Sequence, residues 1–84
     1  MAKKNTTPVV KVTHTEMICW SINYQKSRRD EYVAKKERVK SALISDAEIY
    51  CIESWCDEEI TRIDSTLCFL YQMYQIETGK EYCG

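Results

Sequence analysis

Glycine and proline are nearly absent from this chain of 84 residues. Pro8, Gly79 and Gly84 are the only ones, so residues 9–78 contain neither. A sheet protein of that length would need several turns built on glycine, proline or Asn-Gly pairs. The chain is therefore predicted to be all-α. The same absence excludes a glycine-rich phosphate-binding loop between residues 9 and 78.

Residue types that carry catalysis and metal binding are also scarce. His14 is the only histidine, and the five cysteines include no pair with CxxC spacing. One histidine cannot complete the usual zinc sets of cysteine and histidine, and no cysteine stands three or four residues away from it. We therefore expect no enzymatic activity, no metal site and no cofactor.

The cysteines indicate a cellular setting rather than a chemistry. Their number is odd, and three of the five lie inside apolar helical patterns, where a reduced thiol behaves as a small hydrophobic side chain. We expect buried free thiols and a reducing, cytoplasmic location.

Long apolar segments are missing as well. The longest nearly apolar run, residues 67–76, has about half the length that a bilayer crossing needs. The N-terminal lysines are not followed by the apolar segment of a signal peptide, so no membrane association is expected. The length leaves room for one small domain. We divide the chain into a flexible or extended N-terminal arm (1–12), a single helical domain (13–79) and a short C-terminal tail (80–84).

Capping motifs predict where the helices begin and end. Thr13 with Glu16, and Ser45 with Glu48, have the spacing of the capping box, in which each member of the pair accepts a hydrogen bond from the other's backbone amide. Gly79 suits the left-handed position that ends a helix. The polar run of residues 25–31 has no apolar side chain and can interrupt the first helix.

These signals predict helices at residues 14–25 and 29–43, either separate or joined, and a long helix at residues 46–78. The fold class is therefore an antiparallel helical hairpin or a three-helix bundle with one long C-terminal helix. A helix of that length must be covered by an antiparallel partner helix, by a second subunit, or by both. We expect a homodimer.

The charge is divided along the sequence. Residues 1–44 hold 10 basic and 4 acidic side chains, whereas residues 45–84 hold 2 basic and 9 acidic ones. Either the basic segment binds nucleic acid or the two segments pair with each other. In a hairpin that reverses at residues 44 and 45, the expected pairs are Lys36 with Glu53, Arg29 with Asp57 and Lys40 with Asp46. The candidate electrostatic contacts to a partner are Lys26, Arg28, Lys35, Arg38, Asp46, Glu53, Asp57 and Asp64.

Aromatic and apolar side chains are concentrated near the C-terminus. Residues 67–76 are apolar on nearly all sides of the predicted helix, so one partner helix cannot cover them. Either the N-terminal helix covers a second side with Met17, Ile18, Trp20, Ile22 and Tyr24, or a second copy or a foreign protein does so. Trp55 either packs at the edge of the core or is an exposed anchor. The candidate partner or dimer contacts are Trp55, Phe69, Tyr71, Met73, Tyr74 and Ile76.

These features together predict a small, non-enzymatic intracellular interaction protein. It would act as a regulatory, adaptor or inhibitory module that binds a protein or nucleoprotein partner. The alternative is a nucleic-acid-binding regulator that uses the basic segment 26–40 and the N-terminal arm.

Overall fold

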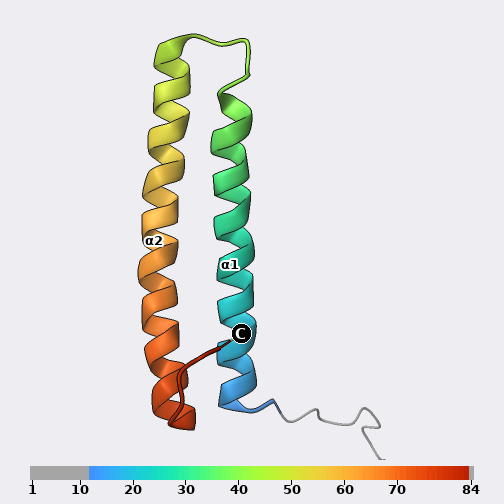
Figure 1. Cartoon of the computed structure of the whole chain (residues 1–84), viewed down its shortest axis with the longest axis vertical. Helices are drawn as coiled ribbons and strands as arrows, with labels where there is room; N and C mark the ends of the chain where they lie inside the picture. The colour runs from blue at the N-terminus through green and yellow to red at the C-terminus, as the bar shows by residue number, and fades with distance from the viewer. Residues whose placement is uncertain (1–11, 84) are drawn as a thin grey trace, which may run out of the picture.

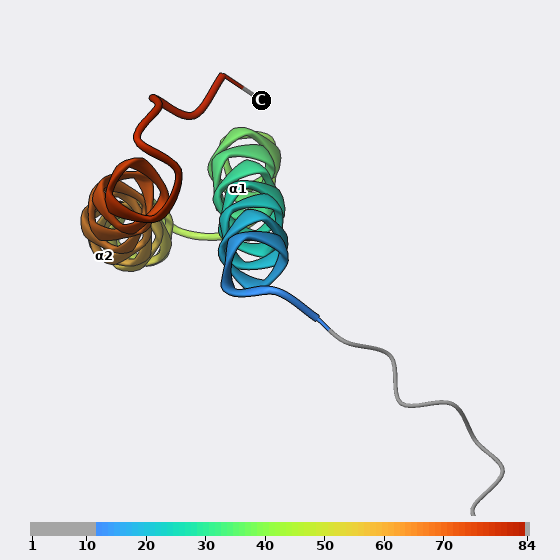
Figure 2. The same cartoon turned by 90° about the horizontal axis from the view of Figure 1, so that it is seen from below.

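A computed structural model describes residues 12–83, which form two long helices packed side by side (Figure 1). Helix α1 runs from His14 to Val39 and helix α2 from Asp46 to Thr78. Residues 40–45 connect them, and the tail after α2 crosses back toward α1 on one side of the hairpin (Figure 2). The prediction of an all-α helical hairpin is confirmed. The predicted arm lies outside the described residues except for Val12.

Both predicted capping boxes are present and start the two helices. The Glu16 amide donates to the Thr13 hydroxyl at 3.1 Å, and the Thr13 amide donates to the Glu16 carboxylate at 3.2 Å. Ser45 and Glu48 make the same reciprocal pair at the start of α2. Gly79 ends α2 with a φ of 73°, the left-handed conformation that glycine adopts without a Cβ penalty.

Helix α1 is continuous through the polar run of residues 25–31, but it ends four residues earlier than predicted. The amides of Ser41 and Ala42 donate to the carbonyls of Arg38 and Val39, which makes a tight turn. Ser45 must be extended, with a ψ of 157°, for its side chain to cap α2. Because the chain needs residues 40–45 to reverse direction, the helix cannot continue to residue 43.

The apolar core lies in the half of the hairpin that is remote from the connection. Its five buried residues interlock between the helices. They are Ile18, Ile22, Ile63, Leu67 and Leu70. Val39 and Cys56 are buried nearer the connection. No helix within residues 12–83 is long and apolar enough to span a membrane.

The cysteines differ from the prediction of buried thiols. All five are free, but only Cys56 is buried and Cys19 is half-buried. Cys51, Cys68 and Cys83 are exposed. The apolar pattern around Cys68 was misleading because the helix is apolar on more sides than α1 can cover.

Candidate functional site

The distribution of charge divides the hairpin into two halves. We call residues 14–25 of α1 and 65–78 of α2 the apolar half, and residues 26–39 and 46–64 the charged half. In the apolar half Glu16 and Glu77 are the only carboxylates, His14 is the only other ionisable group apart from thiols and phenols, and there is no lysine or arginine. In the charged half about every second residue is Lys, Arg, Asp or Glu.

The C-terminal tail covers one face of the apolar half through Tyr82. The ring of Tyr82 stacks on Tyr71, with centroids 5.6 Å apart, and meets Tyr74 edge-on at 5.1 Å. Its hydroxyl lies 3.4 Å from the side-chain oxygen of Asn23 on α1, so the tail bridges both helices. The Lys26 ammonium lies 5.9 Å from the centre of the same ring. Sequence reasoning missed this role of Tyr82.

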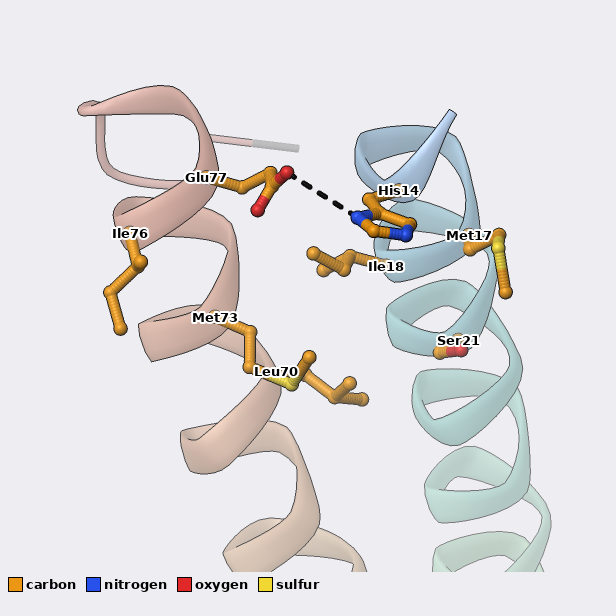
Figure 3. A pocket seen from close by; sticks show the side chains of 8 residues that line it. All are labelled: His14, Met17, Ile18, Ser21, Leu70, Met73, Ile76 and Glu77. Atoms are coloured by element: carbon orange, nitrogen blue, oxygen red, sulfur yellow. Dashed lines mark ion pairs between the residues drawn. The ribbon is translucent and has the colours of Figure 1, made fainter. Parts of the chain in front are cut away.

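The opposite face of the apolar half contains an open groove of about 340 Å³ between the two helices (Figure 3). Ile18, Leu70 and Met73 point across it toward the opposite helix, while Met17 and Ile76 lie at its outer edges. The remaining lining residues are His14, Ser21 and Glu77. His14 Nδ1 lies 3.6 Å from Glu77 Oε1 at the mouth, a contact that is an ion pair only while the imidazole is protonated.

Large apolar side chains are exposed on both helices of the apolar half, and three of them, Met17, Met73 and Ile76, line the groove. On α2 the exposed fractions are 61% for Phe69, 36% for Met73 and 83% for Ile76. On α1, Met17, Trp20 and Tyr24 are each more than half exposed. We call these side chains the apolar surface: Met17, Trp20, Tyr24, Phe69, Met73 and Ile76.

The predicted partner contacts fall into three groups. Phe69, Met73 and Ile76 lie together on the apolar surface. Tyr71 and Tyr74 pack against the tail. Trp55 is in the charged half. Of the two alternatives for covering residues 67–76, the one in which α1 does so applies only to Ile18 and Ile22, which face the core. Met17, Trp20 and Tyr24 are exposed. At 100° per residue these three positions fall on the far side of α1 from Ile22.

Two ion pairs join the helices in the charged half. Arg29 Nε lies 2.7 Å from Asp64 Oδ1, and Lys36 Nζ lies 2.5 Å from Asp57 Oδ1. The hydrogen bond from Arg29 to Asp64 raises the pKa of the guanidinium, and the hydrogen bond from Lys36 to Asp57 raises the pKa of the ammonium. Both pairs are partly exposed to solvent, so each contributes little to stability.

The pairing of basic and acidic flanks is therefore present, but the predicted partners are wrong. Lys36 binds Asp57, one turn further along α2 than expected, and Arg29 binds Asp64, two turns further. Lys40 binds Glu37 near the end of α1 instead of a carboxylate on α2. One reason is that the chain reverses its direction over six residues, 40–45, and not at residues 44 and 45 alone. Long side chains on a helix also lean toward its N-terminus, which for α1 is the direction away from the connection. Glu53 still contributes to the raised pKa of Lys36, whereas Asp46 is exposed in the first turn of α2.

Basic and aromatic side chains alternate along one side of the charged half. The Arg28 guanidinium lies 5.9 Å from the ring centre of Tyr24 and 5.8 Å from that of Tyr32. The Lys35 ammonium lies 5.3 Å from the ring centre of Tyr32 and 5.0 Å from that of Trp55. Tyr32 and Trp55 meet edge to face at 5.4 Å. Trp55 therefore packs at the edge of the interface between the helices while remaining 45% exposed.

The four basic candidates do not form one patch. Lys26 lies beside the tail, whereas Arg28 and Lys35 lie in the row of aromatic rings. Arg38 is exposed on the outer surface of α1, near Glu31 and Lys35. Within residues 12–83 no three His, Cys, Asp or Glu side chains come together as metal ligands would.

Comparison with family models, curated proteins and solved structures finds no match to this chain.

Proposed function

We propose that this protein is a non-enzymatic interaction module, of an adaptor, regulatory or inhibitory kind, that binds protein through its apolar surface. The observation that carries the proposal is the exposure of Phe69 and Ile76, at 61% and 83%, in a half of the molecule with almost no charge. The centres of protein interfaces are depleted in charged residues and enriched in aromatic residues and methionine. The apolar surface has this composition.

The shape and charge of the region favour protein over other classes of ligand. The groove beside Met17 and Met73 is open, and a groove between two helices is suited to the apolar side chains of another helix. Methionines adapt to the shape of a partner because their side chains are unbranched and flexible. The apolar half has no lysine or arginine, which binding to phosphates or to an anionic membrane surface would need.

A photo-crosslinking amino acid tests this proposal. A benzophenone side chain replaces Phe69 in the full chain, and in a control variant it replaces Tyr50, which is 71% exposed on the same helix but in the charged half. Irradiation in cells is expected to give a discrete protein adduct from position 69 and none from position 50. Equal crosslinking at both positions, or none at either, would contradict the proposal.

A second candidate is the nucleic-acid-binding regulator, which the row of Arg28, Lys35 and their aromatic neighbours favours. Cations interleaved with aromatic rings are a feature of surfaces that bind single strands. The contacts of both cations with aromatic rings, and the acidic side chains nearby, make this the weaker candidate. It predicts oligonucleotide binding that weakens steeply with salt, and replacing both cations with glutamine should reduce the logarithmic salt slope by about two. Absence of binding at low salt removes it.

A further inference from the structure

We propose that the protein seated on the apolar surface is a second copy of this chain. The inference rests on the proposed function and names the partner. Two hairpins pack through their apolar halves in opposite directions, so that the apolar halves overlap in a four-helix arrangement and the charged halves project from its two ends.

The charge pattern suits a surface that meets its own copy. In a two-fold symmetric contact each charge near the axis faces a like charge, so a self-associating surface must have few charges. In the apolar half, Glu16 and Glu77 are the only carboxylates, and Glu77 already lies beside His14. Contact between two charged halves would instead bring many like charges together.

The amount of exposed apolar area is also adequate. Six side chains of this size, exposed by a third to four-fifths, offer roughly 700 Å² in total. A second copy that covers most of them therefore buries an area approaching the roughly 800 Å² per partner of a standard interface. The described tail is not available to cover this area, because Tyr82 packs against the opposite face. A second copy is the one occupant that is present wherever the chain itself is present.

The geometry allows each copy to fill the groove of the other. Phe69, Met73 and Ile76 are spaced by four and three residues, so they form a continuous ridge on α2. The groove between Met17 and Met73 runs beside this ridge on the same face. In the proposed dimer the apolar side chains of the two copies interdigitate over this face, as side chains do in helix bundles.

The charged half decides the direction of the two copies. Lys35 follows Met17 by 18 residues, which is five turns of an α-helix, so the side of α1 that contains Met17 is basic further along the helix. A parallel arrangement that overlapped along the whole hairpin would bury charged side chains such as Lys35 in the interface. The antiparallel arrangement overlaps only the apolar halves, over about 20 Å, and leaves these charges in water.

Sedimentation equilibrium of the full chain under reducing conditions tests the inference. The mass is expected to rise with concentration from 9.9 kDa to twice that value. Phe69→Glu is expected to raise the dimer dissociation constant roughly 30-fold or more, the factor for one central aromatic anchor. Tyr50→Glu on the charged half and the conservative Phe69→Leu should leave it within a few-fold of the original value. Loss of helix in Phe69→Glu that is restored at high concentration would also support the inference.

Three results would overturn it. They are a wild-type chain that stays at 9.9 kDa at all concentrations, a dimer that is equally stable in Phe69→Glu, and a dimer that Tyr50→Glu disrupts. The crosslinking experiment separates this failure from failure of the proposed function. If the chain is monomeric but position 69 crosslinks to a different protein, the second copy is the wrong occupant and the interaction module stands. If position 69 crosslinks to nothing, both proposals fail.

Discussion

The two halves of the hairpin are held together by different forces. In the apolar half, buried isoleucine and leucine side chains fill the space between the helices, and Tyr82 adds aromatic contacts from the tail. In the charged half Val39, Cys56 and Ile63 are buried between the helices, but the helices are also joined by partly exposed ion pairs and by rings that lie beside cations. Each fully buried large apolar side chain stabilises a fold by about 1.5 to 3 kcal/mol, whereas an exposed ion pair contributes about 0 to 1 kcal/mol.

The two halves therefore differ most in their outward surfaces. The outward surface of the apolar half exposes large apolar side chains. The outward surface of the charged half is solvated, and its ion pairs favour the antiparallel alignment of the helices. Charged side chains on the outside of the hairpin are well solvated by water. The half that is apolar on its outside is the one for which we propose a partner.

The largest expected effect comes from the core of the apolar half. Ile22 is completely buried, and Ile22→Ala removes methyl and methylene groups and leaves a cavity, so we expect it to lower the free energy of unfolding by about 2 to 5 kcal/mol. The matched control is Val33→Ala in the charged half of the same helix, where the side chain is 40% exposed and the expected loss is below about 1 kcal/mol. Denaturant unfolding at a fixed protein concentration measures both. Equal losses of unfolding free energy in the two variants would contradict the difference between the two halves.

The tail should contribute the next largest effect. Tyr82→Ala removes two aromatic contacts and is expected to cost about 1 to 3 kcal/mol. Tyr82→Phe keeps both ring contacts and loses only the hydroxyl near Asn23, so it should cost less than about 1 kcal/mol. Thermal unfolding of the two variants under the same conditions separates them. A Tyr82→Ala variant as stable as the wild type would mean that the tail does not cover this face in solution.

The ion pairs should show a smaller effect that depends on salt. A double-mutant cycle on Arg29 and Asp64 is expected to give a coupling of about 0.2 to 1 kcal/mol at low ionic strength, and less in high salt. The same cycle on Arg29 and Asp57 should give a coupling near zero, because Asp57 binds Lys36 instead. A larger coupling to Asp57 would support the register expected from the sequence alone.

The smallest effect concerns the start of α2 and depends on pH. The Ser45 amide and hydroxyl donate to the Glu48 carboxylate and lower its pKa. A carboxylate whose pKa is lowered by folding adds stability above its unfolded pKa and loses that contribution as the pH falls through its folded value. Glu48→Gln should therefore destabilise the protein at neutral pH and have little effect well below about pH 4. In a Ser45→Ala background this pH dependence should largely disappear, and its persistence there would assign it to another group.

Local signals in the sequence were sufficient to predict the helix boundaries that depend on a few neighbouring residues. Both capping boxes and the glycine at position 79 act within one turn, so the starts of both helices and the end of α2 could be derived from residue types and spacing. The excess of apolar side chains at residues 67–76 also predicted correctly that one helix could not cover them. The exposure of Phe69 and Ile76 follows from that excess.

Features that depend on the path of the chain could not be derived in this way. The ion-pair partners of Arg29 and Lys36 depend on how many residues the connection uses and on which way long side chains lean. The contact of Tyr82 with the apolar half depends on the direction of the chain after Gly79. No periodic pattern encodes either property, because each is decided by packing between segments that are distant in the sequence.

Hydrogen exchange of the backbone amides at low and high protein concentration tests the central claim most directly. If the apolar half is the interface with a second copy, amides in residues 14–25 and 65–78 should become more protected as the concentration rises, while those in residues 28–38 and 48–60 should change little. Protection that is independent of concentration in both halves, or that rises mainly in the charged half, would contradict the account.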